Sequence, residues 1–232
     1  MDPTLTERLC AAHPLPGLVW RFPAPRRTVS SAVHGGGIGD RHWILNTTVR
    51  LDYARRDPDV HLAEIAAALG LGGPGVGLLT AVDVTRHHTA TDGGVHVTAT
   101  VGISSPAWAA APDDHFRREL PACHPRAAAF AEYDTLRYRP GTINLVVAVP
   151  VPLAPAALVN AVVTATEAKT QALFEAGVEA TGTASDAVVV HCPTGDPGEP
   201  YAGPRSRWGG RLARATHAAV RDGIRAWLER PR

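Results

Sequence analysis

A stripe of hydrogen-bonding side chains runs along one face of a helix that the sequence predicts over residues 155–176. Its members, at positions i, i+4, i+7 and i+11, are Asn160, Thr164, Glu167 and Gln171. A solvated stripe normally carries Lys, Arg and Glu, whereas this one places short uncharged groups around a single carboxylate. Such a carboxylate can act as a general acid or base, so the pattern indicates the wall of a polar pocket. An ordinary exposed stripe fits the spacing equally well.

A second polar segment, residues 181–186, reads TGTASD and comes directly before an apolar strand predicted over residues 186–191. Its small residues permit a ligand to approach closely. Asp186 stands where the apolar run begins, and Thr183 lies three positions earlier. A polar strand entrance with a capping carboxylate is the alternative interpretation.

His34 is followed by three glycines, Gly35, Gly36 and Gly37. Successive glycines let backbone N–H groups approach a ligand oxygen closely, and the segment matches the oxyanion loop of some esterases. The GxSxG motif that carries the nucleophile of those esterases is absent from the chain, so their fold is not indicated. A tight turn explains the glycines at least as well.

Other familiar motifs fail their context or are missing. Residues 70–75 spell GxGxxG, but a predicted helix precedes them and a strand follows, which is the reverse of a dinucleotide-binding loop. We interpret them as a helix-exit loop. The chain has no Walker A or HExxH motif, and its three cysteines lack CxxC spacing. The sequence therefore predicts no metal site.

The composition is that of a soluble globular protein, with 232 residues of which 45% are hydrophobic and 19% charged. The net charge of +1 gives no general attraction to nucleic acid or to an anionic membrane. No apolar run reaches membrane-spanning length, and no amino-terminal targeting pattern is present. With sparse cysteines, these features predict a cytoplasmic protein that binds neither nucleic acid nor membrane.

The elements that must position these groups change in type along the chain. The first half is rich in strand patterns and hairpins, and the second half reads strand, helix, strand, helix. The main predicted helices cover residues 58–69, 155–176 and 206–229. This order favours an α+β fold, in which a mixed, largely antiparallel sheet or paired sheets are flanked by helices as a layered sandwich.

We find no internal repeat and no linker that would force a domain boundary. The sequence therefore predicts a single domain over residues 1–232. Within it, residues 1–29 are expected to be an irregular lead-in with a short strand around Leu18–Phe22, and residues 106–140 are expected to be an insertion over the site.

Seven stretches carry a family resemblance over almost the whole chain. They are SSAVHGGGIGDRHWILN (30–46), GVGLLTAVDV (75–84), ATVGISSPAWA (99–109), PGTINLVVAV (140–149), ATEAKTQAL (165–173), GTASDAVVV (182–190) and YAGPRSRWGGRLARATHAAV (201–220). In this order they resemble the adenosylcobinamide amidohydrolase family, and several motifs in one order are more specific than any single motif.

The resemblance implies hydrolysis of the amide that joins aminopropanol to a corrin side chain of adenosylcobinamide. The products are adenosylcobyric acid and aminopropanol, and the reaction belongs to corrinoid salvage. Amide hydrolysis needs an activated nucleophile, a stabilised oxyanion and a protonated leaving amine. For the acid–base role Glu167 is our first choice, Asp186 is the second, and His34 is an alternative.

The remaining roles have several candidates each. The oxyanion is assigned to the backbone amides of the three glycines or to the side chains of Asn46 and Asn144. Thr183 and Ser104 are candidate nucleophiles. Substrate binding is assigned to Asn160 and to tryptophan rings that could stack on the corrin, namely Trp43, Trp108 and Trp208. Each tryptophan also fits ordinary core packing.

No cofactor is implied, because the cobalt is carried by the corrinoid substrate. The expected partner is that small molecule, and homo-oligomerisation is left open. Two other hypotheses remain, of which the first shares the cleft and the second shares only the scaffold. One is a corrinoid carrier or sensor without catalysis, and the other is an amidohydrolase for an unrelated amide. Glu167→Gln is predicted to lower turnover by orders of magnitude and to leave corrinoid affinity roughly intact, and near-normal turnover would remove Glu167 from the acid–base role.

Overall fold

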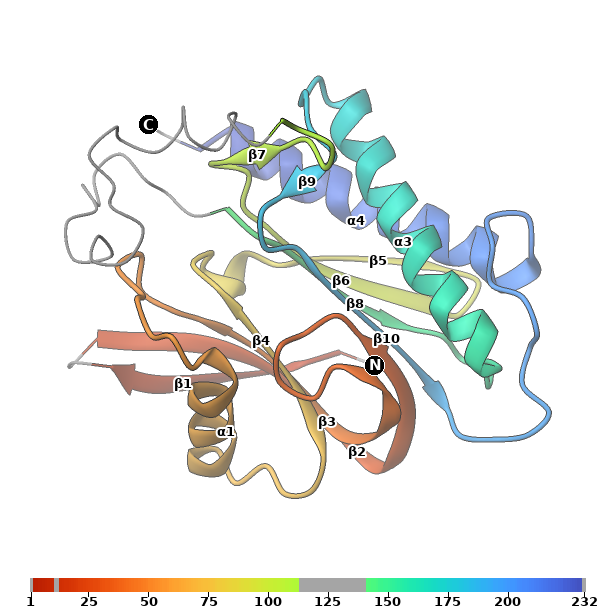
Figure 1. The fold of residues 1–232 in the computed structure, drawn as a ribbon, viewed down its shortest axis with the longest axis horizontal. Coiled ribbons are helices and arrows are strands. Elements are labelled where there is room, and N and C mark those ends of the chain that lie inside the picture. Colours follow the sequence, from red (N-terminus) through yellow and green to blue (C-terminus); the bar gives the residue numbers. More distant parts are fainter. Residues whose placement is uncertain (1, 11–12, 113–140, 231–232) are drawn as a thin grey trace.

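The computed structural model describes residues 2–10, 13–112 and 141–230, which form an α+β fold (Figure 1). The strands are β1 Thr4–Cys10, β2 His13–Ser30, β3 Gly37–Thr48, β4 Gly75–Thr80, β5 His88–Asp92, β6 Val95–Val101, β7 Pro106–Ala107, β8 Ile143–Ala148, β9 Gly182–Thr183 and β10 Ala187–Pro193. The helices are α1 Pro58–Ala68, α3 Pro155–Glu175, α4 Arg207–Leu228 and the short 3-10 helix η1 Val84–Arg86. No helix in these ranges is long and apolar enough to cross a membrane.

Eight strands form one mixed sheet in the order β4-β3-β2-β10-β8-β6-β5, with β1 beside β2. The pairs β3–β4 and β8–β10 are parallel, and the other neighbours are antiparallel. The long strand β2 joins the two halves of the sheet. It pairs with β1 and β3 before a register shift between Arg21 and Arg26, and with β3 and β10 after it. The strands β7 and β9 form a separate two-stranded sheet.

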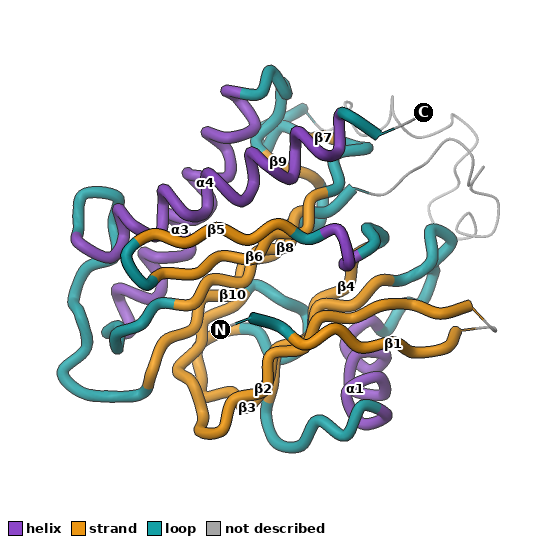
Figure 2. The backbone as a smooth tube through the Cα atoms, turned by 180° about the vertical axis from the view of Figure 1, so that it is seen from behind, coloured by secondary structure: helices purple, strands orange, loops and turns teal. Residues whose placement is uncertain are grey.

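The halves of the sheet are covered by different helices. Figures 1 and 2 show α3 and α4 over the half that contains β5, β6 and β8, and α1 beside the other half. Between the halves lies an apolar cluster that takes Leu18 and Ile44 from one side and Val146 and Val189 from the other. The molecule is therefore a layered sandwich of helix, sheet, sheet and helix, which confirms the predicted fold class.

Local signals explain why the helices begin and end where they do. Pro58 and Pro155 lie in the first turns of α1 and α3, where a missing N–H group costs nothing. Gly70 and Gly177 follow these helices with φ angles of 66° and 74°, a conformation that other residues rarely adopt. The predicted helices over residues 58–69 and 155–176 are thus confirmed to within one residue.

The strand predicted around Leu18–Phe22 lies within β2, but the prediction that the rest of residues 1–29 is irregular is wrong, because β1 and β2 form an antiparallel hairpin there. The segment contains several prolines, which cannot donate to a ladder, but they lie where the sheet tolerates them. Pro14 and Pro16 fall where β2 pairs with β1 alone, and Pro23 and Pro25 fall inside the register shift. Of the predicted insertion at 106–140, residues 113–140 lie outside the described residues.

His191 on β10 is fully buried in the space between the two halves of the sheet. The Nε of Arg26 donates a hydrogen bond to its Nδ1 at 3.2 Å, so the proton of the neutral ring lies on Nε2. Burial lowers the pKa of His191 to about 3, and the positive charge of Arg26 acts in the same direction. The ring is therefore neutral in the folded protein across the physiological range.

This burial predicts a loss of stability in acid. Between pH 6.5 and 3 the unfolded chain protonates His191 and the folded chain does not, so its stabilising contribution is full above pH 6.5 and falls as the pH drops. From pH 7 to pH 5 the loss should be about 2 kcal/mol. Urea unfolding of the wild type and of His191→Leu at both pH values measures it. Equal losses in the two proteins would contradict the assignment.

Candidate active site

A carboxylate, a hydroxyl and an ammonium group meet at Asp186, directly before β10. Asp186 Oδ1 accepts hydrogen bonds from Thr183 Oγ1 at 2.5 Å and from the Ile143 amide at 2.9 Å. Its Oδ2 accepts from Lys169 Nζ at 2.5 Å and from the Thr183 amide at 3.1 Å. The side chains of Lys169 and Asp186 are only 8% and 10% exposed. We call Thr183, Asp186 and Lys169 the carboxylate cluster.

The fold brings the cluster together from three elements. β8 and β10 are parallel and begin side by side, with Asn144 opposite Ala187, so the segments that precede them meet at one edge of the sheet. Lys169 reaches this edge from α3. Gly182 makes room, because a Cβ at this position would collide with both Asp186 Oδ2 and Lys169 Nζ. The lack of a side chain at residue 182 therefore allows the Lys169–Asp186 ion pair to form at this edge of the sheet.

Lys169 was missed in the sequence, although two signals mark it. It falls on the buried face of α3, four residues from Ala165 and from Leu173, where helical periodicity predicts an apolar side chain. It is also the only lysine in the chain, since every other residue of the 23 in the Lys and Arg count is arginine. Lysine is almost never buried unless its charge is paired. A lone lysine on a buried helix face therefore indicates a carboxylate partner in the core.

Asn46 and Asn144 lie on the inner side of the sheet. The Nδ2 of Asn144 donates to Asn46 Oδ1 at 3.0 Å and to the Leu79 carbonyl at 3.1 Å. The Nδ2 of Asn46 donates to Thr100 Oγ1 at 3.1 Å. These bonds link β3 and β4 to β6 and β8, and they occupy both amide hydrogens of Asn144. Both side chains are buried and brace the two halves, which leaves Asn144 no hydrogen for the predicted oxyanion role.

His34 and the triple glycine lie against other elements. The His34 ring stacks on Trp43, with centroids 5.7 Å apart, and its Nδ1 lies 3.2 Å from the Asp59 carbonyl of α1. The carbonyls of Gly35 and Gly36 accept hydrogen bonds from the Arg41 guanidinium.

Gly35 and Gly37 have positive φ angles, so the segment is the tight turn that we gave as the alternative. His34 and the glycine turn contact β3 and α1, whereas Asp186 contacts α3, β8 and β9. The structure therefore does not bring His34 and the glycines to Asp186 through shared contacts.

The predicted polar stripe of α3 does not form one wall. Thr164 is buried and donates to the Ala202 carbonyl at 2.8 Å, and Asn160 lies beside Gly203. Glu167 and Gln171 are exposed. The desolvated setting expected for Glu167 is therefore wrong, because the helix turns this side chain outward. Its catalytic role stays a prediction without that physical reason.

The predicted stacking residues also separate. Trp43 and Trp208 are buried, with exposed fractions of 3% and 7%, and each indole N–H donates to a protein oxygen, the Gly73 carbonyl and Glu199 Oε1 respectively. Neither ring presents a face to a ligand. Trp108 is 43% exposed and is discussed below.

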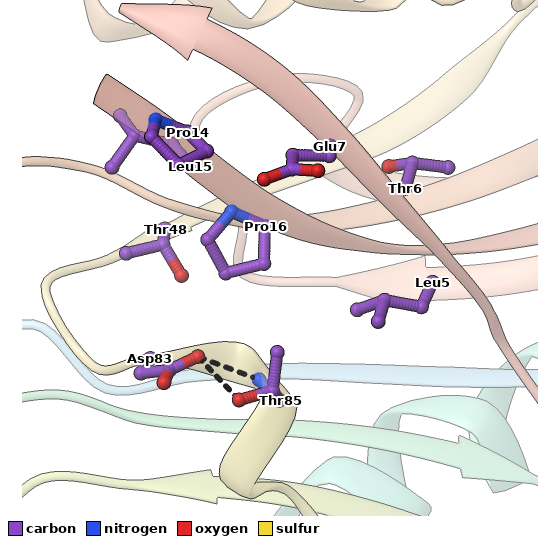
Figure 3. Close-up of a pocket in the computed structure, with 9 residues that line it drawn as sticks. All are labelled: Leu5, Thr6, Glu7, Pro14, Leu15, Pro16, Thr48, Asp83 and Thr85. Carbon is purple, nitrogen blue, oxygen red and sulfur yellow. Dashed lines mark hydrogen bonds between the residues drawn. The ribbon is translucent and has the colours of Figure 1, made fainter.

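A cavity of about 570 Å³ lies between the β1–β2 hairpin and η1 (Figure 3). It is lined by Leu5, Thr6, Glu7, Pro14, Leu15, Pro16, Thr48, Asp83 and Thr85. The carboxylate of Asp83 accepts hydrogen bonds from the amide and the hydroxyl of Thr85 and so caps η1. Among the described residues, no basic side chain lines this cavity, so it offers less chemistry than the carboxylate cluster does.

Within residues 2–10, 13–112 and 141–230, no group of three His, Cys, Asp or Glu side chains is arranged to hold a metal ion. The groups of the carboxylate cluster are those that proton transfer and nucleophilic attack require. A hydroxyl that is hydrogen-bonded to a paired carboxylate is an arrangement that a hydrolase can use.

The comparisons with known proteins specify the family. The model of the adenosylcobinamide amidohydrolase family matches residues 3–232, so the chain belongs to this family and is an amidohydrolase. It is 36% identical over 206 residues to the adenosylcobinamide amidohydrolase of Halobacterium salinarum, across 88% of this chain and 80% of that protein. It is 30% identical over 210 residues to that of Methanosarcina mazei, across 87% and 89%.

Among solved structures, the PH0078 protein from Pyrococcus horikoshii OT3 aligns with 93% of this chain and 77% of its own, at a TM-score of 0.44 and 11% identity.

Proposed function

We propose that the protein hydrolyses the amide bond between aminopropanol and the corrin side chain of adenosylcobinamide. The products are adenosylcobyric acid and aminopropanol, and the reaction serves corrinoid salvage. The names of the two relatives and the family match support the substrate. The observation that carries the chemistry is the hydrogen bond from Thr183 Oγ1 to Asp186 Oδ1 at 2.5 Å, beside Lys169.

In the first step Thr183 Oγ1 attacks the carbonyl carbon of the amide. Asp186, which already accepts the hydroxyl hydrogen bond, takes the proton as the new C–O bond forms. The ammonium of Lys169 balances the carboxylate charge and holds it in place. When the C–N bond breaks, the proton passes to the nitrogen, and aminopropanol leaves as a neutral amine.

In the second step water attacks the resulting ester of Thr183. Asp186 accepts a proton from the water, and the proton returns to Thr183 Oγ1 as the ester C–O bond breaks. Adenosylcobyric acid is released, and the hydroxyl is regenerated. The cobalt of the corrinoid takes part in neither step, and no further cofactor is needed.

Incubation of the purified protein with adenosylcobinamide tests the proposal. Stoichiometric release of aminopropanol and adenosylcobyric acid, resolved by chromatography and mass spectrometry, is the expected result. Tight binding without release would instead favour a carrier or sensor. A protein that neither binds nor cleaves any corrinoid would favour an amidohydrolase for another amide.

A further inference from the structure

A shallow depression of about 430 Å³ lies on the outer face of α3, beside the two-stranded sheet of β7 and β9. Its apolar part is made by Trp108 and Phe174, which are 43% and 73% exposed. Glu167 and Gln171 supply its polar groups. Large aromatic side chains grouped at the surface mark binding sites more often than isolated ones do. We call this surface the aromatic depression.

The exposure of the tryptophans also favours the aromatic depression as the binding surface. Among the three considered for stacking on a corrin ring, Trp43 and Trp208 are packed in the core, and only Trp108 presents its indole at the surface. An indole with an exposed face and a neighbouring phenyl ring suits a broad, flat apolar ligand better than a small polar one.

Hydrogen bonds tie the aromatic depression to Thr181, which lies two residues before Thr183 of the carboxylate cluster. Thr170 Oγ1 donates to the Thr181 carbonyl at 3.0 Å, and the Ala109 amide donates to Thr181 Oγ1 at 2.8 Å. Thr181 and Thr183 are two residues apart, so their Cα atoms are separated by at most about 7 Å. A ligand seated on the aromatic depression could therefore extend a side arm of a few bonds toward Thr183.

We propose that the aromatic depression binds one apolar face of the corrin ring, so that the amide-bearing side arm extends to Thr183. This inference rests on the proposed function and names the surface that recognises the ring. Trp108 and Phe174 contact the ring, while Glu167 and Gln171 bind amide groups at its rim. The volume of about 430 Å³ is near the lower end for drug-sized ligands, which fits contact with one face of the ring.

Binding and turnover of the double variant Trp108→Ala/Phe174→Ser test the inference. Equilibrium dialysis with adenosylcobinamide should give a Kd at least tenfold higher than that of the wild type. KM should rise in parallel, while kcat stays within about threefold, since the carboxylate cluster is untouched. Both side chains are exposed, so the melting temperature should change little.

Val159→Ala is the matched control. Val159 is an apolar residue on α3 that is 53% exposed, and it lies about 22 Å along the helix from Phe174. Its Kd and KM should equal those of the wild type.

The outcomes separate the surface from the reaction. If the wild type releases aminopropanol and the double variant has an unchanged Kd, the aromatic depression is not the ring site, and the proposed function still stands. If the wild type binds the corrinoid without releasing aminopropanol and the double variant binds it more weakly, the ring site is supported and the reaction is refuted. If the substitutions instead convert an oligomer to a monomer at unchanged Kd, a second copy covers this face and the inference fails.

Discussion

Replacing Thr183 by Val should lower the release of aminopropanol from adenosylcobinamide by about 10³-fold or more. Valine keeps the shape of threonine and removes only the hydroxyl, so the Lys169–Asp186 ion pair and the backbone amide bond from residue 183 to Asp186 stay in place. The enzyme would then retain its base and lose its nucleophile. The measurement is kcat, with Kd for the corrinoid recorded alongside it.

Thr183→Ser is the matched control, because it restores a hydroxyl at the same position and should keep kcat within about tenfold of the wild type. A second readout follows the intermediate directly. Hydroxylamine added during turnover should intercept the ester and yield a corrinoid hydroxamate in the wild type but not in Thr183→Val. Turnover in Thr183→Val close to that of the wild type would show that Asp186 activates water instead.

Replacing Lys169 by Met should lower the free energy of unfolding by about 3–5 kcal/mol, because it leaves the buried carboxylate of Asp186 without its counter-charge. Both side chains of this pair are about nine-tenths buried, so solvent screens the lost charge only weakly. Methionine has a similar length and helix propensity, which keeps changes in packing and in α3 small. Urea unfolding at pH 7 measures the difference.

Two further variants show how much of the lost stability comes from the unpaired buried charge. The double variant Lys169→Met/Asp186→Ala removes both charges and should recover part of the lost stability. Arg214→Met breaks an ion pair with Asp92 whose side chains are 64% and 28% exposed, and it should cost less than about 1 kcal/mol. Equal losses in Lys169→Met and Arg214→Met would mean that burial of the Lys169–Asp186 pair adds nothing.

The elements of this fold were predictable where their signals are local. Pro155 and Gly177 bound α3, and the Gly93–Gly94 turn joins β5 to β6, so neighbouring residues were enough to predict them. The order of strands was not predictable, because β2 pairs with β10 near the other end of the chain. The tolerance of β2 for proline likewise depends on a register shift that only the partner strand defines.

The residues of the candidate site were likewise predictable only where the signal is local in the sequence. Thr183 and Asp186 were each predicted as site residues, but the sequence did not pair the hydroxyl with this carboxylate, a contact that the turn between them creates. Lys169 joins them only through the packing of α3 on the sheet. For Glu167 the helical spacing correctly put it on one stripe with Gln171, but spacing does not say toward which side the stripe turns. The contacts of α3 decide that, and they turn it outward.

The partnership of β2 with β10 has a consequence for synthesis on the ribosome. Ser30 pairs with Val189, and about 160 residues separate them, which takes roughly 8–30 s to translate. During that interval β2 can pair with β3 and, over its first part, with β1, but residues 26–30 wait with the amide and carbonyl groups of their second edge unpaired. Nascent chains therefore pass through a stage prone to edge-to-edge association, and folding chaperones or slower expression should raise the yield of native protein.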